Sequence, residues 1–156
     1  MKIGVYAVGN KMPSWVQEAW HEYAKRMPKE CSLNLHEIKP EARSGGKSTQ
    51  QVMQAEASRI KHAVPDKNYL IILDEHGKDL STMSLSKSLK KWLSLGSDIA
   101  IVIGGADGLD QELKASANET IRLSSLTLPH PMVRIILAEQ IYRAWSILHG
   151  HPYHRA

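Results

Sequence analysis

The stretch that decides the fold is IAIVIGGADGLD, residues 99–110. Its first five residues are apolar, and two adjacent glycines follow them, with a third glycine three positions later. A continuous apolar run of this kind is typical of a strand covered on both faces, as in a parallel sheet. We therefore predict a buried strand that ends in a loop where the backbone approaches a neighbour closely.

Strand-like and helix-like segments alternate on both sides of this stretch. Apolar or alternating runs predict strands at 2–9, 32–39 (an exposed or edge strand), 68–74, 98–105 and 119–124. Helical spacing predicts helices at 13–27, 49–64, from Ser81 or Thr82 to about Leu95, 110–117 and 131–149. This order predicts an α/β fold with a mostly parallel sheet and helices on both faces. No repeat or linker divides the sequence, so we expect one domain over residues 1–156.

The composition is that of an ordinary globular protein with 156 residues and a formal net charge of +4. The positive charge mildly favours an anionic partner such as RNA. A single cysteine, Cys31, rules out an internal disulfide and fits a cytoplasmic location. The most apolar stretch, 131–148, contains three charged residues, so we expect no membrane span. The N-terminal residues fit a first strand better than a signal peptide.

The segment GGKST, residues 45–49, follows a predicted strand and opens a predicted helix, as a phosphate-binding P-loop does. A P-loop requires a glycine at position 41, where this chain has Glu41. A flexible basic loop is therefore the favoured interpretation. Its Lys39, Arg43 and Lys47 are candidates for contacts with an RNA backbone.

Three predicted strands end in segments that are unusual for simple turns: LDEHGK (73–78), GGADG (104–108) and LSSLTLPHP (123–131). The glycine spacing GGxxG differs from the GxGxxG of dinucleotide-binding folds, and a tight turn without a ligand is the alternative. Ligands of open α/β sheets lie beyond the carboxyl ends of the strands. We therefore predict that the three ends converge on one crevice.

The segment LSSLTLPHP is too apolar for a loop that lies in water, so we expect it to be packed. Its backbone groups would then face a partner. A flat apolar ring with polar edges, such as adenine, fits this description. A buried loop without a ligand is the alternative.

In the predicted last helix, 12 of the 19 residues from 131 to 149 are apolar, more than one stripe against a sheet requires. This surplus predicts a second buried face and hence a partner subunit, while a helix that is central within one chain is the alternative. Glu139 and Arg143 are spaced for an ion pair within the helix.

The last residues, HGHPYHRA (149–156), are aromatic and cationic. We expect this tail to dock over a site, where Tyr153 stacks on a base and Arg155 meets a phosphate. A solvated tail and a metal site are the alternatives, and the lack of a nearby cysteine or carboxylate argues against the metal.

Four motifs together resemble the bacterial ribosomal RNA large-subunit methyltransferase H family, over essentially the whole chain: AVGNKMPSWV, LDEHGK, IGGADGL and LSSLTLPHPMVRIILAEQIYRAWSILHGHPYHR. The resemblance implies a SPOUT methyltransferase with a C-terminal trefoil knot, a homodimer, and S-adenosylmethionine as the methyl donor, without a metal. It also implies methylation of N3 of a pseudouridine in 23S rRNA, on the assembled ribosome.

Matching the motifs implies that the cofactor contacts one set of residues: Leu73, Gly104, Gly105, Leu123, Ser124, Ser125, Leu126, Thr127 and Leu128. The candidate proton acceptor is His154, whose rival role is to position RNA. Tyr153, Arg155 and Arg143 are candidates for substrate binding, and His130 for a structural role. A non-enzymatic RNA- or ribosome-binding domain, and a kinase or ATPase, are the alternative functions.

Overall fold

The five strands form one parallel sheet in the order β2-β1-β4-β3-β5, in a computed structural model that describes residues 1–155. The strands are β1 (Lys2–Val8), β2 (Ser32–Ile38), β3 (Tyr69–Asp79), β4 (Ile99–Ile103) and β5 (Glu119–Arg122). The predicted α/β class is confirmed, and β2 lies at an edge as expected. The apolar residues 99–103 that precede the glycines form β4, the central strand, and all five are buried.

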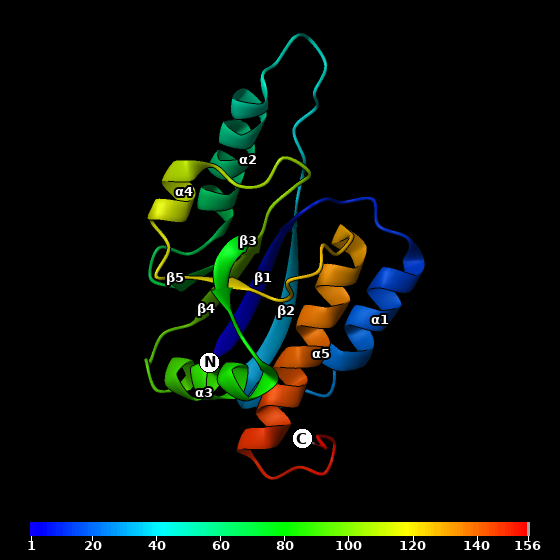
Figure 1. Cartoon of the computed structure of the whole chain (residues 1–156), viewed down its shortest axis with the longest axis vertical. Helices are drawn as coiled ribbons and strands as arrows, with labels where there is room; N and C mark the ends of the chain where they lie inside the picture. The colour runs from blue at the N-terminus through cyan, green and yellow to red at the C-terminus, as the bar shows by residue number, and fades with distance from the viewer. Residues whose placement is uncertain (156) are drawn as a thin grey trace.

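Helices cover both faces of this sheet (Figure 1). They are α1 (Ser14–Ala24), α2 (Thr49–Ala63), α3 (Thr82–Leu93), α4 (Gln111–Ala115) and α5 (His130–Leu148), with a short 3-10 turn at Lys29–Cys31. Helices α1, α3 and α5 lie on one face, and α2 and α4 on the other. The predicted bounds differ from these by a few residues, as is usual at frayed helix ends.

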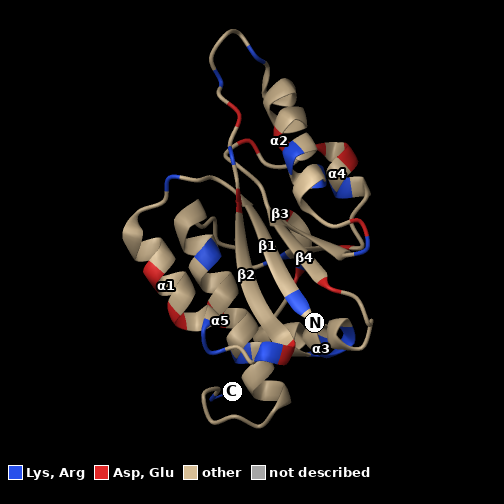
Figure 2. Cartoon of the chain, turned by 180° about the vertical axis from the view of Figure 1, so that it is seen from behind, with Lys and Arg blue, Asp and Glu red and all other residues tan. Residues whose placement is uncertain are grey.

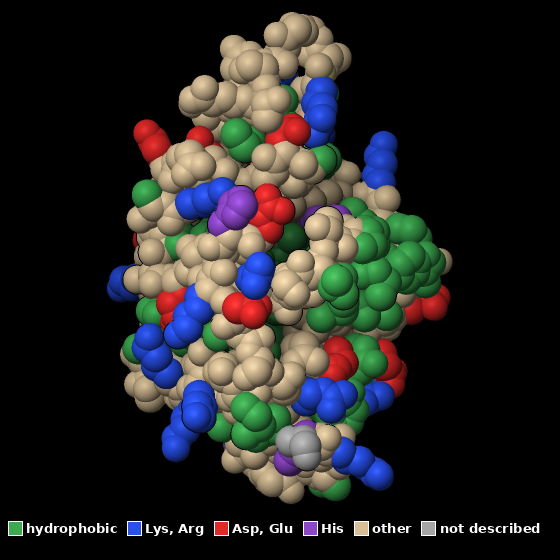
Figure 3. All heavy atoms as spheres, in the orientation of Figure 1, with side chains coloured by type: hydrophobic (Ala, Val, Ile, Leu, Met, Phe, Trp, Pro, Cys, Tyr) green, Lys and Arg blue, Asp and Glu red, His purple; other side chains and the backbone are tan. Residues whose placement is uncertain are grey.

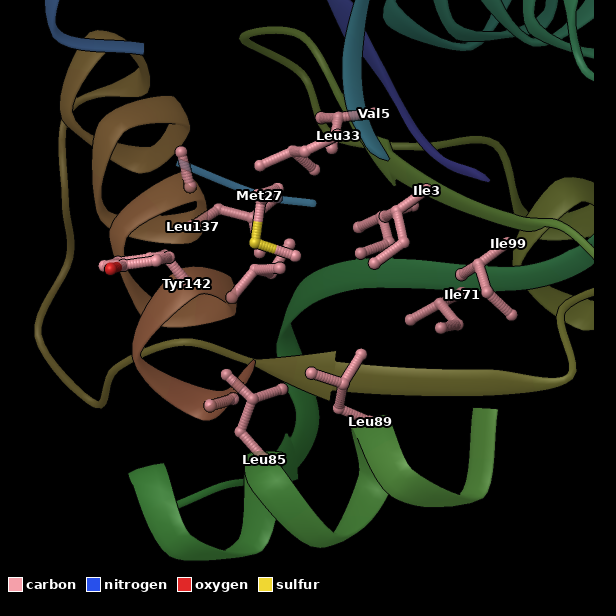
Figure 4. Packing of buried hydrophobic residues seen from close by; sticks show 14 of the residues in the cluster. Ile3, Val5, Met27, Leu33, Ile71, Leu85, Leu89, Ile99, Leu137 and Tyr142 are labelled. Atoms are coloured by element: carbon pink, nitrogen blue, oxygen red, sulfur yellow. The ribbon is translucent and has the colours of Figure 1, made fainter. Parts of the chain in front are cut away.

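The core has two layers because successive strand residues point to opposite faces of the sheet. On the larger side, Ile3, Ile71 and Ile99 from the strands pack with Leu89 of α3 and Leu137 of α5 (Figure 4). On the other side, Tyr6, Ile72 and Val102 belong to a second cluster that includes residues of α2 and α4. The sheet is thus buried on both faces.

Helix α5 packs against both α1 and α3. Its buried residues are Arg134, Leu137, Ala138, Ile141, Tyr142, Ala144 and Ser146. Five of its apolar residues are buried, whereas Met132 is exposed and six others are only partly buried: Val133, Ile135, Ile136, Trp145, Ile147 and Leu148. Helix α5 therefore keeps a partly exposed apolar face, and the partner subunit expected from it stays a prediction.

Strand β3 continues to Asp79, so the predicted end of this strand at residue 74 is wrong. The strand pairs with β5 up to Leu73, shifts register, and pairs again from Lys78. A Cβ at Gly77 would lie 2.6 Å from the backbone of Ile121, so only glycine lets the two strands approach this closely. The residues between form a bulge, which a polar sequence alone does not distinguish from a turn.

No helix within residues 1–155 is both long and apolar enough to cross a bilayer.

Candidate functional site

A cavity of about 890 Å³ lies beyond the carboxyl ends of β4 and β5, beside residues 73–76 of β3. Its walls come from residues 73–76, 103–109 and 122–128, so the predicted convergence of the three segments is confirmed. All nine residues predicted to contact a cofactor line this cavity: Leu73, Gly104, Gly105, Leu123, Ser124, Ser125, Leu126, Thr127 and Leu128. Their role as cofactor contacts stays a prediction.

The glycine loop after β4 forms a tight turn on one wall of the cavity. The Gly108 N–H donates to the Gly105 carbonyl over 3.0 Å, and Gly108 has a φ of 84°. A Cβ at Gly104 would lie 2.7 Å from Leu109 Cγ. The glycines therefore permit the tight turn, and they also leave no side chain between the backbone and the cavity. Both interpretations of the motif, a tight turn and a close approach to a ligand, fit this geometry.

The loop after β5 is more open than we predicted. Ser125, Leu126 and Thr127 are exposed, and the Leu126 side chain is 74% exposed. The loop borders the cavity instead of packing against another element, which is why its apolar residues are uncovered. Within residues 1–155, no backbone group of residues 124–128 pairs with another backbone group. The loop thus offers backbone donors and acceptors at the cavity.

Sequence reasoning missed several cavity residues. Asp74, Glu75 and His76 of the β3 bulge line it, as does Met12, which follows β1. The signal was present in the quoted LDEHGK motif, from which only Leu73 was selected. Lys114 pairs with Asp74 over 3.4 Å, so this carboxylate on the wall is partly neutralised.

A buried cluster centred on Arg134 ties the start of α5 to the strand ends. Arg134 is 1% exposed, and its guanidinium donates to Glu37 Oε2 (2.8 Å), the Gly9 carbonyl (2.8 Å) and His130 Nε2 (3.0 Å). Burial, and then the Arg134 charge, lower the pKa of His130, so its ring is held neutral. His130 lines the cavity, and its bond to Arg134 is consistent with the structural role expected for it.

Most of the basic side chains in the loop before α2 form ion pairs. Arg43 pairs with Asp107 of the glycine loop over 2.8 Å, and Lys47 pairs with Glu41 over 3.4 Å. Lys39 is exposed. Figure 2 shows Lys and Arg positions in this loop and also near the end of α5. Two of the three predicted phosphate contacts therefore already have an acidic partner.

The C-terminal tail lies at a second, smaller pocket of about 450 Å³. The pocket is lined by Ser81, Thr82 and Met83 at the start of α3, and by Arg143, Ile147, His154 and Arg155. Arg143 Nε donates to Glu139 over 2.7 Å, so the predicted ion pair within the helix forms. Three of the four tail and helix residues predicted for catalysis or substrate binding are thus brought together.

The fourth, Tyr153, packs against the same helix. Its ring centroid lies 4.6 Å from that of Tyr142, and the guanidinium carbons of Arg143 and Arg26 lie 5.1 and 5.7 Å from it. Burial, and then Glu139, raise the pKa of the Tyr153 phenol, which stays neutral at pH 7. The tail is therefore docked on α5 and not a solvated end.

The two pockets lie at opposite ends of α5 (Figure 1). The helix has 19 residues, which corresponds to about 28 Å at ~1.5 Å per residue. The tail of a chain therefore lies away from the cavity of the same chain, and its docking over a substrate site stays a prediction.

No group of three or more His, Cys, Asp and Glu side chains in residues 1–155 is arranged to hold a metal ion.

Comparisons of the sequence with known proteins identify the family of the chain. The profile of the family described as "Predicted SPOUT methyltransferase" matches residues 1–154. A relative from Ralstonia pickettii is 61% identical over 99% of both chains, and one from Bordetella avium is 59% identical over the full length of both. Both carry the name ribosomal RNA large subunit methyltransferase H.

A solved structure shares the fold at low sequence identity. It is that of a probable methylase family protein from Haemophilus influenzae, with a TM-score of 0.58 and 11% identity, covering 99% of this chain and 70% of that one. At this identity the likeness concerns the fold alone. The full-length match to the family profile goes further: the chain belongs to the SPOUT methyltransferase family, as its sequence motifs had indicated.

Proposed function

We propose that the chain transfers a methyl group from S-adenosylmethionine to N3 of a pseudouridine in 23S rRNA, on the assembled ribosome in the cytoplasm. Full-length relatives at 58–61% identity are named ribosomal RNA large subunit methyltransferase H, which supports rRNA as the substrate. The single observation that carries the proposal is that all nine motif-matched residues surround one cavity.

The cavity fits the methyl donor in size and in chemistry. A volume of about 890 Å³ is within the range of small-molecule sites. Apart from the Leu126 N–H, which donates to Ser124 Oγ, the backbone groups of residues 124–128 suit the polar edge of an adenine ring, and the neighbouring leucines suit its faces. Gly104 and Gly105 keep side chains away from the bound molecule. The residues present are therefore compatible with this cofactor.

When bound, the cofactor supplies an electrophilic methyl group. The chain's own task is to align the acceptor nitrogen with that group and to remove the N3 proton. Alignment of two bound reactants lowers a barrier by up to about 7–11 kcal/mol. His154 is the proposed acceptor of the proton, because a neutral imidazole has one unprotonated ring nitrogen. Arg143 and Arg155, which line the same small pocket, would hold the RNA.

We propose a homodimer in which the tail of one copy completes the cavity of the other. The separation along α5, about 15 Å between the lining residues Val133 and Arg143, supports this arrangement, because each chain has both halves of a site but keeps them apart. Large apolar side chains are also exposed near the cavity: Trp15 is 48% and Met132 is 38% exposed. Figure 3 shows hydrophobic side chains gathered over the area of α1 and the start of α5. Such a patch suits a second copy.

The single SPOUT domain and its trefoil knot also belong to this proposal. The full-length match to the family profile supports them. The two loops that line the cavity, 103–109 and 122–128, are the segments in which we expect the crossing.

The test is methylation by the purified protein with labelled S-adenosylmethionine and three substrates: free 23S rRNA, the isolated large subunit and the whole ribosome. We expect one methyl group on one pseudouridine, most rapidly with the whole ribosome. Mass spectrometry of rRNA from cells without the protein should show the loss of that same methyl group. Absence of transfer to all three substrates, with RNA binding intact, would instead indicate the non-enzymatic RNA-binding function.

A further inference from the structure

A serine in the last turn of α5 contacts the proposed catalytic histidine. Ser146 is 0% exposed, and its hydroxyl donates to the carbonyl of Arg143 over 2.7 Å. His154 Nδ1 lies 3.3 Å from the same oxygen. Ser146 is buried on a helix where the adjacent positions carry apolar or aromatic side chains, so a hydroxyl is unusual at this position.

The hydrogen bonds of this serine define the protonation of the ring. A hydroxyl has one hydrogen, and that of Ser146 is already given to Arg143. The oxygen is therefore left as an acceptor for His154, so Nδ1 must carry a hydrogen. In a neutral imidazole the other nitrogen, Nε2, is then an unprotonated acceptor. Within residues 1–155, no group of the protein hydrogen-bonds to His154 Nε2.

We infer that Ser146 is a positioning residue, which fixes His154 in the Nδ1–H tautomer and leaves Nε2 free to accept the N3 proton of the substrate base. The inference rests on the proposed function for its catalytic part. It also explains why a polar residue is buried at this point of α5.

The surroundings of the tail support a fixed ring. Tyr153, the residue before His154, is held between Tyr142, Arg26 and Arg143, which limits the movement of the backbone there. Ser146 then restricts the rotation of the His154 side chain. Packing thus holds the backbone at Tyr153, and the contact with Ser146 orients the side chain of the next residue, His154.

Nuclear magnetic resonance tests the tautomer directly, without activity. The two ring nitrogens of each histidine are distinguished by their ¹⁵N shifts, and His154→Ala identifies the signals of His154. In the wild-type protein we expect the Nδ1–H form to dominate above the titration of the ring. In Ser146→Ala we expect a shift towards the Nε2–H form. A dominant Nε2–H form in the wild type would overturn the inference.

Kinetics test the functional part. In single-turnover reactions with saturating RNA, Ser146→Ala should reduce the rate of methyl transfer about 3- to 10-fold, the effect expected for one neutral hydrogen bond. The affinity for S-adenosylmethionine should not change. Ser86→Ala is the matched control, because Ser86 is also a buried helical serine that donates to a carbonyl three residues earlier, Met83, but contacts no histidine. Its rate should equal that of the wild type.

The outcomes separate this inference from the proposed function. An active wild-type enzyme whose Ser146→Ala variant keeps the full rate overturns the positioning role and leaves the methyltransferase function intact. A wild-type protein that transfers no methyl group overturns the proposed function, while the resonance measurement still decides the tautomer. Equal losses in the Ser146 and Ser86 variants would indicate a general loss of helix packing and would also overturn the inference.

Discussion

The cavity at the strand ends and the tail pocket at the other end of α5 differ in how they are built. The cavity is formed mainly by three backbone turns of one sheet edge, with glycines and loop residues as its walls. The tail pocket is formed by side chains of α3, α5 and the chain end, with two arginines and a histidine. One region is suited to enclose a small molecule, and the other to hold an anion and exchange a proton.

The fold therefore places backbone turns and glycines in one region and charged side chains in the other. A parallel sheet creates a crevice at the carboxyl ends of its strands, and no further element is needed for it. The charged groups are carried by a helix that starts at the crevice and leads away from it. In the function proposed above a second copy brings the two regions together, so changes in either region should have separable effects.

The largest effect is expected from the tail. His154→Ala should reduce the single-turnover rate of methyl transfer at least about 100-fold, because general base catalysis contributes typically that much or more. Binding of S-adenosylmethionine, measured by calorimetry, should not change, since His154 does not line the cavity. His149→Ala is the control, because His149 stacks on Trp145 and does not line the pocket. An unchanged rate would remove His154 from the chemistry.

The second effect should be confined to the cavity. A methyl group at Gly104 would displace Leu109, which also lines the cavity. Overpacking of this kind costs ~1–3 kcal/mol, so Gly104→Ala should weaken cofactor binding about tenfold. In Gly4→Ala the new methyl group meets only the side chain of Tyr6, away from the cavity, and calorimetry should show wild-type affinity. Equal affinity of both variants would mean that the donor binds elsewhere.

The smallest effect concerns pH. Burial and Arg134 hold the pKa of His130 below its ordinary value of 6.5, so the folded state binds fewer protons than the unfolded state just below that pH. Stability is therefore fully present above pH 6.5 and is lost as the pH falls towards the folded pKa. His130→Gln removes this titration but keeps an acceptor for Arg134. Urea unfolding at pH 7.5 and pH 5 should show a smaller decline for this variant.

His76→Gln is the control for the pH measurement, since His76 is exposed at the cavity rim. Its decline in stability between the two pH values should match that of the wild type. A decline of the same size in His130→Gln would show that His130 is not held neutral in the folded protein.

Much of the fold and the position of the cavity could be predicted from the sequence. The apolar run of β4 and the polar strand ends obey rules of local pattern and sheet geometry, which hold without knowledge of the neighbours. These rules brought the nine motif-matched residues to one place. The continuation of β3 past residue 74 could not be predicted, because Lys78 and Asp79 form a strand only through pairing with β5.

The tail region was less predictable because its contacts depend on tertiary packing. In the sequence, Arg134 and Ser146 only interrupt an apolar helix. In the structure both are buried, and they make the contacts that fix His130 and His154. The contacts of α5 with α1 and α3 likewise follow from the packing of distant segments, so the sequence alone could not tell which apolar residues of this helix are covered within the chain.

The most direct test of a site shared between two copies is complementation between a cavity variant and a tail variant. The cavity variant is Gly104→Ala, with a second cavity substitution where cofactor binding must be weakened further, and the tail variant is His154→Ala. In a randomly mixed 1:1 sample, half of the dimers carry both variants, and in each of these one site combines an intact cavity with an intact tail. We predict that methyl transfer recovers to about a quarter of the wild-type rate. If each site instead uses the cavity and tail of one chain, no site is repaired, and a mixture no more active than the separate variants would contradict the account.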